Sequence, residues 1–189
     1  MVQTAPPGRP RSESARAAVL YAVDDLLTEI GYSAMTMKGI AERAGVGRQT
    51  VYRWWPTKAH ILIEACADDA RTELTVTAHK DPVRTITDYL ATLGRFLTAE
   101  PAGVGYRALL GEAQHDAEVA GLVAAADLLA GPTRVVLEQL RPQLGQLPND
   151  QFAVAELCGP IVLIVLTGGA VPPRAELRDH ARRLVTAWS

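Results

Sequence analysis

The stretch AGVGRQTVYRWWPTK (residues 44–58) decides how the front of this chain folds, because it combines a tight turn with a short basic, aromatic helix. Gly45 lies where a helix would end and the backbone needs a positive φ, which glycine adopts without a steric penalty. Gly47 is an acceptable N-cap for the next helix, and Pro56 stops that helix about two turns later. A helix this short is not stable alone. Neighbouring helices must therefore hold one of its faces, which leaves the other face free to bind a partner.

The residues before this stretch predict two further helices. Between residues 15 and 30 the apolar residues recur at the spacing of one helical face, and Gly31 ends that helix. Thr36 caps a second helix over residues 37–44, with Ile40 and Ala41 on its apolar side. Three helices within residues 15–58, the last two joined by a turn that contains glycine, form a helix-turn-helix arrangement.

A set of residues at fixed spacing carries a resemblance to a known family: Thr36, Ile40-Ala41, Ala44-Gly45-Val46, Thr50-Val51-Tyr52, Trp55 and Lys58. In this set the chain resembles the N-terminal DNA-binding domain of TetR-type bacterial transcriptional regulators, over residues 15–65. The resemblance implies an all-α protein, in which a three-helix DNA-binding domain precedes a larger helical domain for ligand binding and dimerisation. Four positions depart from the family pattern. Gly47 replaces the usual Ser or Thr cap, Gln49 replaces a common Gly, and Trp54-Trp55 replace what is more often a His, Tyr or Arg followed by Phe.

The predicted DNA contacts follow from the position of each side chain on this domain. The first turn of a recognition helix points into the major groove, where Arg suits guanine and Gln suits adenine. We therefore expect base contacts from Arg48, Gln49 and Thr50. The resemblance implies contacts to DNA phosphates from Thr36, Lys38, Tyr52, Arg53 and Lys58. For Tyr52, a partly buried place in the core is the alternative.

Charge is unevenly distributed along the chain. Residues 1–58 carry eight Lys or Arg against five Asp or Glu, a net charge of +3, whereas the remainder carries eleven against sixteen, a net charge of −5. The front of the chain therefore suits a polyanion. Residues 1–13 are expected to be a disordered basic arm, whose Arg9 and Arg11 would follow an A·T-rich minor groove. An ordinary solvated tail is the alternative.

Residues 59–189 are expected to form a second helical domain behind the DNA-binding domain of residues 14–58, with about nine helices in the whole chain. Pro and Gly separate its helices: one runs from Thr57 to about residue 77, the next starts at Asp81-Pro82, and one from Asp116 is kinked at Gly131-Pro132. The β-branched run at 161–166 has strand propensity but no partner strand, so a helix from 149 or 150 to about 167 is predicted. Its apolar stretch is too short to span a membrane.

The resemblance implies that the last two helices pair with their copies in a homodimer, while closing the subunit's own core is the alternative. The expected interface residues are Phe152, Leu163, Leu166, Leu177, Leu184 and Trp188. The middle helices are expected to enclose a cavity for a small apolar effector, although the same residues could fill a solid core. The expected lining residues are Tyr89, Leu93, Phe96, Tyr106, Leu109, Leu110, Glu112 and Leu128.

Nothing in the residue pattern predicts catalysis. Cys66 and Cys158 are too few for a disulfide framework, and the four histidines lack the spacing of metal ligands. No cofactor and no metal are expected, and the lack of an apolar leader favours a reducing cytoplasm. The sequence thus predicts a cytoplasmic homodimeric regulator, a repressor that a small apolar ligand releases from a palindromic operator DNA. A helical carrier or enzyme and a non-specific, nucleoid-type DNA-binding protein are the alternatives.

Overall fold

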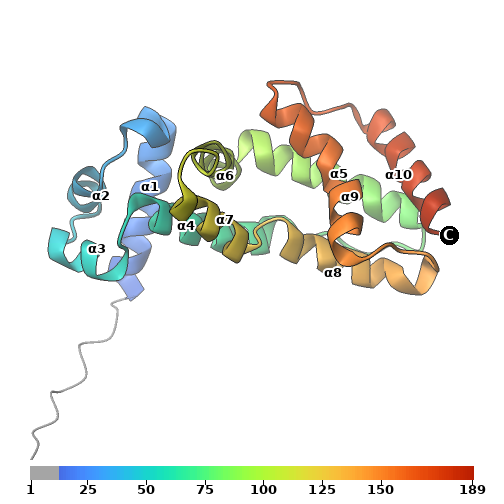
Figure 1. The fold of residues 1–189 in the computed structure, drawn as a ribbon, viewed down its shortest axis with the longest axis horizontal. Helices are drawn as coiled ribbons and strands as arrows, with labels where there is room; N and C mark the ends of the chain where they lie inside the picture. Colours follow the sequence, from blue (N-terminus) through green and yellow to red (C-terminus); the bar gives the residue numbers. More distant parts are fainter. Residues whose placement is uncertain (1–12) are drawn as a thin grey trace, which may run out of the picture. The chain divides into compact units, whose positions relative to one another are not determined.

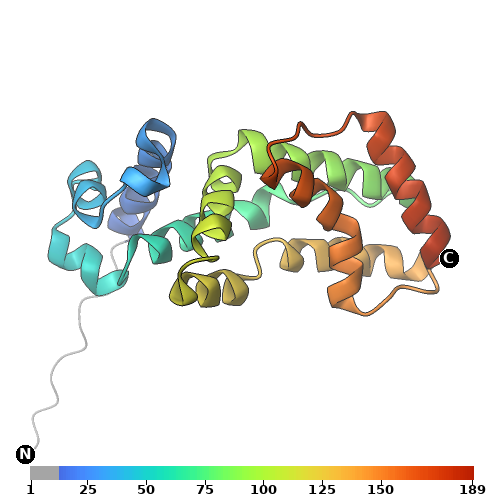
Figure 2. The same ribbon diagram turned by 45° about the horizontal axis from the view of Figure 1, so that its top comes forward.

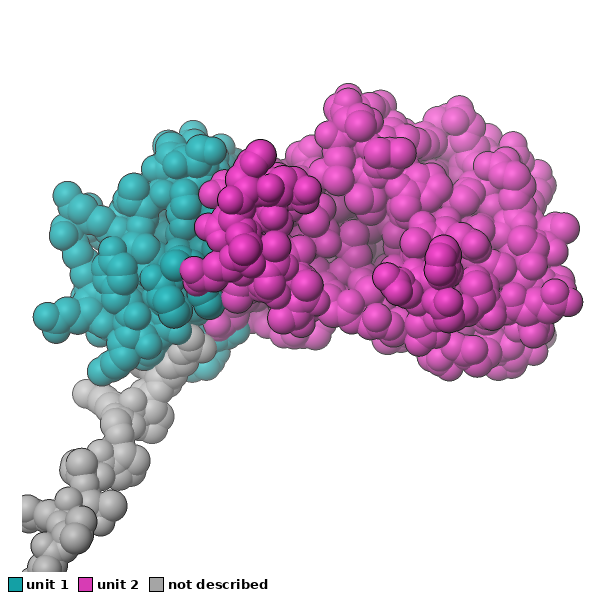
Figure 3. All heavy atoms as spheres, viewed as in Figure 1, with its two compact units in different colours: residues 1–61 teal, residues 62–189 magenta. Residues whose placement is uncertain are grey.

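The computed structural model describes residues 13–189, which form ten α-helices and one 3-10 turn and contain no strand (Figures 1 and 2). The all-α prediction is confirmed. The elements are α1 (Glu13–Ala34), α2 (Met37–Ala44), α3 (Arg48–Trp54), α4 (Lys58–Glu73), α5 (Pro82–Ala99), α6 (Pro101–Glu112), α7 (Ala117–Ala126), α8 (Ala130–Leu140), η1 (Arg141–Gln143), α9 (Asp150–Leu166) and α10 (Arg174–Trp188). Contacts divide the chain into two compact units, residues 1–61 and residues 62–189, with the boundary inside α4 (Figure 3).

The first unit is built on the face of α1 that the sequence pattern marks as apolar. Val19, Val23 and Leu27 are buried on this face, and α2 packs against α1. Gly31 has a φ of 74°, so the regular helix breaks where the sequence predicts, and a last helical turn runs on to Ala34. Because α2 also packs against α3, Ile40 completes the core of this unit.

The second unit is arranged around α5, which packs against α6, α8, α9 and α10. Asp81 caps α5 as predicted, by accepting a hydrogen bond from the Val83 amide at 2.9 Å. The apolar stripe of α5 is buried along its length. α6 approaches it at Gly103, where a Cβ atom would lie 1.8 Å from the carbonyl oxygen of Phe96. Only glycine allows the two helices to cross this closely.

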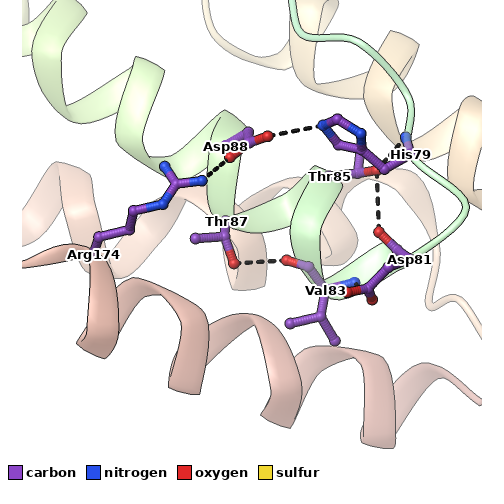
Figure 4. A network of polar contacts seen from close by, with 7 residues as sticks. All are labelled: His79, Asp81, Val83, Thr85, Thr87, Asp88 and Arg174. Atoms are coloured by element: carbon purple, nitrogen blue, oxygen red, sulfur yellow. Dashed lines mark hydrogen bonds and ion pairs between the residues drawn. The ribbon is translucent and has the colours of Figure 1, made fainter.

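A polar network ties the loop after α4 to α5 and to the start of α10 (Figure 4). His79 Nε2 lies 2.9 Å from one carboxylate oxygen of Asp88, and Arg174 forms an ion pair with the other. The His79 amide also donates to the Thr85 hydroxyl at 2.8 Å. Burial raises the pKa of Asp88, but the hydrogen bonds from Arg174 and His79 outweigh it and lower the pKa overall. The charged carboxylate therefore helps to fix α10 on α5.

Two helix ends differ from the sequence prediction. α4 ends at Glu73 rather than near residue 77, because the β-branched residues 75–77 have low helix propensity. The break predicted at Gly131-Pro132 lies at Asp127, whose φ of 50° ends α7. Aspartate adopts this left-handed conformation more readily than most residues. Pro132 instead lies in the first turn of α8, where its missing amide hydrogen costs little.

One described stretch, Ala117–Gln143, has the length and the mean hydropathy, 1.5, of a membrane-spanning helix. The break at Asp127 divides it into α7 of 10 residues, α8 of 11 residues and the short η1. None of these reaches the length of about 20 residues that crosses a bilayer. The hydropathy of this stretch is therefore a weak indication of a membrane span.

The last two helices differ from each other in how far they are covered. The run at 161–166 is helical, as predicted, within α9. Leu177, Leu184 and Trp188 of α10 are 3%, 7% and 2% exposed, because α10 packs against α5 of the same subunit. Within one subunit, the packing of α10 on α5 thus already covers these three residues. On α9, by contrast, Phe152, Leu163 and Leu166 are 61%, 64% and 47% exposed.

Candidate nucleic-acid interface and effector cavity

Local capping fixes the turn between α2 and α3. Thr36 begins α2 by accepting a hydrogen bond from the Gly39 amide at 3.0 Å. Gly45 ends the helix with a φ of 64°, and its amide donates to the Glu42 carbonyl at 3.3 Å. The Val46 amide then donates to the Ala41 carbonyl at 3.1 Å, which completes a Schellman-type cap. The cap and the turn predicted at this place are thus confirmed.

α3 is held from one side only. Val51 and, directly after the helix, Trp55 are 0% and 2% exposed, so both belong to the core of the first unit. The Trp54 ring meets the Trp55 ring edge to face, with centroids 5.6 Å apart. Gly47 precedes the helix without a side-chain cap, and its carbonyl accepts the Thr50 amide at 2.9 Å. The remaining face of α3 is open.

The predicted base-contacting residues lie on the open face at the start of α3. Arg48 and Gln49 are exposed and Thr50 is half-buried. The Arg48 guanidinium is engaged with α2, because its Nη2 lies 2.7 Å from Glu42 Oε1. The sequence did not predict this pair. No local pattern could have revealed it, since the two residues belong to different helices.

Four of the five residues predicted to contact phosphates are exposed around α2 and α3. These are Thr36, Lys38, Tyr52 and Arg53. Tyr52 is 51% exposed, which argues against the alternative that it fills the core. Lys38 Nζ lies 4.0 Å from the Glu42 carboxylate. The two arginines of the predicted minor-groove arm, Arg9 and Arg11, lie outside the described residues.

The fifth of these residues, Lys58, has a different environment. Its ammonium donates to the carbonyl oxygens of Tyr32 at 2.8 Å and Met35 at 3.1 Å, and it lies 4.2 Å from the centroid of the Tyr32 ring. Tyr32 lies in the last turn of α1 and Met35 directly after it, where the helix dipole attracts a cation. Lys58 therefore fastens the start of α4 to the end of α1, a role that the sequence did not suggest.

A second ion pair braces the surface between α1 and α2. Arg43 Nη1 donates to Glu29 Oε1 at 2.8 Å, and Asp25 lies 3.6 Å from the same guanidinium. The hydrogen bond from Arg43 lowers the pKa of the Glu29 carboxyl. Arg43 is thus turned toward α1, whereas Arg48 lies on the side of α2 that carries Lys38 and Glu42.

The second unit contains a cavity of about 500 Å³ between the end of α4 and the α7–α8 junction. Most of its wall is apolar, and its two charged lining residues have partners: Arg71 pairs with Asp68, and Asp127 pairs with Arg134. Gln139 and Thr75 add polar groups. Such a wall suits an uncharged, largely apolar molecule, because a charged ligand would lose its hydration without gaining a counter-ion.

A smaller cavity of about 360 Å³ lies between the α7–α8 junction and α9. Tyr106 and Cys158 supply its polar atoms together with Asp127. Burial raises the pKa of Tyr106 to about 12 and that of Cys158 to about 11, so both side chains stay neutral near pH 7. The Cys158 thiol also lies 3.2 Å from the Thr133 hydroxyl. A buried, protonated thiol of this kind is a poor nucleophile.

The predicted effector-binding residues are only partly brought together. Leu128 lines both cavities and Tyr106 lines the smaller one. The other six predicted residues line neither cavity: Tyr89, Leu93, Phe96, Leu109, Leu110 and Glu112. Tyr89, Leu93, Phe96 and Leu109 fill the core around α5, as the alternative held, and Glu112 is exposed. The wall formed by α4 was missed, because the sequence does not say which face of α4 turns toward α8.

A family model matches most of the first unit and the start of the second. A family model described as bacterial regulatory proteins of the tetR family matches residues 20–65. These residues span most of α1, the whole of α2 and α3, and the first half of α4. Among residues 13–189, no group of three or more His, Cys, Asp or Glu is placed to hold a metal ion.

Related proteins extend the likeness beyond this unit. The Bacillus subtilis (strain 168) helix-turn-helix transcriptional regulator YdeS is 38% identical over 113 residues, which span 60% of this chain and 57% of YdeS. The match thus spans less than two thirds of that relative. The Mycobacterium tuberculosis (strain ATCC 25618 / H37Rv) transcriptional repressor KstR is 26% identical over 176 residues, 89% of this chain and 76% of KstR. The crystal structure of the TetR family regulator SCO0332 matches with a TM-score of 0.73 at 25% identity, over 92% of this chain and 98% of that one.

Proposed function

We propose that this chain, which belongs to the TetR family of bacterial regulatory proteins, binds an operator DNA as a homodimer and leaves it when an uncharged, largely apolar ligand binds. The family consists of transcriptional regulators and not of enzymes. The observation that carries the proposal is the open face of α3, which presents Arg48, Gln49 and Tyr52 while Val51 is buried. The likeness to the repressor KstR favours repression over activation.

Base recognition would come from the first turn of α3. Arg48 can bond guanine O6 and N7, and Gln49 can bond adenine N6 and N7. An Arg48→Ala variant should lose about 1–3 kcal/mol of operator affinity and relax the preference at one symmetric pair of positions. Equal losses on operator and on random DNA would instead make Arg48 a phosphate contact.

Phosphate contacts would position the domain without reading the sequence. Lys38, Tyr52 and Arg53 are exposed beside the same face, and the Thr36 cap brings free amides of the α2 N-terminus to the surface. An Arg53→Ala variant should bind all sequences more weakly and reduce the salt dependence by about one charge per half-site. An unchanged salt slope would remove Arg53 from the interface.

A homodimer is supported by the uncovered apolar side chains of α9. Phe152, Leu163 and Leu166 recur at helical spacing and are exposed in the single subunit. Exposed apolar clusters of this kind mark interaction sites. A Leu163→Glu variant should sediment as folded monomers, since a glutamate there is costly only inside an interface. Val135→Glu, which changes an exposed apolar residue of α8, is the control and should not alter the oligomeric state.

The larger cavity is the proposed effector site. Its occupation would release DNA if the ligand prefers the arrangement in which two DNA-binding domains do not match successive major grooves. Coupling of this kind is reciprocal, so a ligand that weakens operator binding a hundredfold loses about 2.7 kcal/mol of its own affinity on operator-bound protein. An Ala67→Phe variant, which fills the cavity wall, should bind operator normally but respond less to the ligand. Calorimetric titration with and without operator tests this, and equal affinities in both would exclude the compound as an effector.

The decisive experiment is selection of binding sites from a randomised duplex library by the full-length protein. Enrichment of a palindromic sequence that survives a large excess of bulk DNA would support a specific regulator. Binding that bulk DNA competes away would favour the nucleoid-type alternative. No binding at low salt would favour a helical carrier.

A further inference from the structure

The surface beside α3 carries an acidic residue where DNA binding by itself would call for basic ones. Glu42 lies on α2, and its carboxylate accepts a hydrogen bond from Arg48 Nη2 at 2.7 Å. Lys38 Nζ lies 4.0 Å from the same carboxylate oxygen. The side chains of Arg48 and Glu42 are 53% and 57% exposed, so the pair stands at the surface and not in the core.

Such a pair contributes little to folding, because exposed ion pairs are worth at most about 1 kcal/mol and are screened by salt. Near DNA its carboxylate is also unfavourable, since phosphates repel it. The arrangement therefore needs an account other than stability or general affinity for DNA.

Orientation of the guanidinium provides that account. The guanidinium is a planar fork with five donors, and the bond to Glu42 engages Nη2 only. Nη2 carries two N–H groups, so its second one can still act with Nη1 or Nε to form the two parallel bonds that guanine O6 and N7 accept. A guanidinium already held in one plane loses less rotational freedom when it makes those bonds.

We propose that Glu42 is a specificity-determining residue, which holds Arg48 in the plane that reads guanine and penalises complexes in which Arg48 turns away to a phosphate. The inference rests on the proposed function, that α3 reads operator DNA. On a cognate site, Arg48 keeps its bond to Glu42 while it reads the base. On a non-cognate site, Arg48 must leave Glu42 to reach a phosphate, and the carboxylate then faces the DNA without its partner. Glu42 thus weakens non-specific binding more than operator binding.

The test compares Glu42→Ala with wild-type protein on the sequence that the wild type selects from a randomised duplex library. Alanine is a good helix former, so the exposed substitution preserves α2. We expect the preference for guanine at the position that Arg48 reads to fall about fivefold or more, within the usual range for one base pair. Affinity for random DNA should rise, and its salt dependence should steepen by about one charge per half-site, because Arg48 becomes free to contact a phosphate.

Two further variants separate orientation from a simple change of charge. Glu29→Ala removes an exposed carboxylate of the same unit that also pairs with an arginine, Arg43, but it leaves Arg48 untouched. It should leave the base preference unchanged. In an Arg48→Ala background, adding Glu42→Ala should have no further effect on preference, because Glu42 acts through Arg48.

The outcomes distinguish this inference from the proposed function. If the wild type enriches a site and Glu42→Ala keeps the same guanine preference, the specificity role is refuted and the regulator remains. An equal loss of preference in Glu29→Ala would refute it too, because charge alone would then explain the effect. If the wild type enriches no sequence at all, the proposed function itself fails.

Discussion

Replacing Lys58 by methionine separates the structural role of its ammonium from the predicted phosphate contact. The ammonium donates to the Tyr32 and Met35 carbonyls at 2.8 and 3.1 Å and lies over the Tyr32 ring at 4.2 Å. Methionine keeps a long apolar stem but removes the charge and both hydrogen bonds. The end of α1 would then lose its attachment to the start of α4.

The size of the loss follows from these contacts. Hydrogen bonds that involve a charged group contribute about 1.5–3 kcal/mol, and a cation over an aromatic ring adds about 0.5–1 kcal/mol. Lys58 is half-buried, so in the variant water can form part of the hydrogen bonds that the Tyr32 and Met35 carbonyl oxygens lose. We expect the free energy of opening at the end of α1 to fall by about 2 kcal/mol, which is roughly 30-fold in the opening equilibrium.

Hydrogen exchange on the full-length protein measures this directly at the amides of α1 and α2. Lys38→Met is the matched control, because it makes the same chemical change at an exposed lysine of the same unit. Protection in Lys58→Met within about threefold of the control would refute the anchoring role. The salt dependence of operator affinity is the second measurement. If it falls by about one charge per half-site in Lys58→Met, Lys58 contacts a phosphate.

Three further predictions concern the second unit. Gly103→Ala should lower the free energy of unfolding by more than about 2 kcal/mol in denaturant titration, because its Cβ would lie 1.8 Å from the Phe96 carbonyl oxygen. Gly111→Ala on the same helix is the control. Its Cβ would meet nothing within 4 Å, so this variant should be neutral or stabilising. Leu184→Glu should unfold this unit, with a loss of several kcal/mol seen by circular dichroism, and folded monomers would contradict its place in the core. Asp88 has a folded pKa below its unfolded value, so the stability it contributes is present above about pH 4 and is lost as the pH falls through the folded pKa. Asp88→Asn should therefore lose less stability than wild type as the pH falls below about 4, and parallel acid-unfolding curves would contradict this.

Much of the first unit could be predicted because its determinants are local. A cap such as Thr36 or Gly45 acts on amides and carbonyls within a few residues, so the sequence alone places it. The same holds for Asp81 at the start of α5 and for Asp116 at the start of α7. The break at Asp127 was missed, since several residues nearby satisfy the same local rules and packing selects among them. The end of α4 was placed too late, although the β-branched residues 75–77 give a local reason for it.

The residues whose neighbours the sequence did not predict have partners far along the chain. Leu177 and Leu184 lie at helical spacing in the sequence, but this spacing does not say what covers them, and α5 does so within the subunit. The effector cavity was expected among the middle helices, but the sequence does not say which faces of those helices meet. Periodicity identifies a face of a helix, while the neighbour of that face is a property of the whole fold.

Charged residues near α3 show where this distinction bears on function. The sequence places Arg48 and Lys58 at helix starts, where both would face a phosphate or a base. In the structure the Lys58 ammonium is committed to carbonyls 23 and 26 residues away in sequence, while Arg48 is held only by the exposed Glu42. The Lys58 ammonium, which is held by two carbonyls, stabilises the domain, whereas the Arg48 guanidinium can exchange Glu42 for a group on the DNA. Whether a charged group is already bound within the protein therefore matters more than its position in the helix. It separates the residues expected to read DNA from those that hold α3 in place.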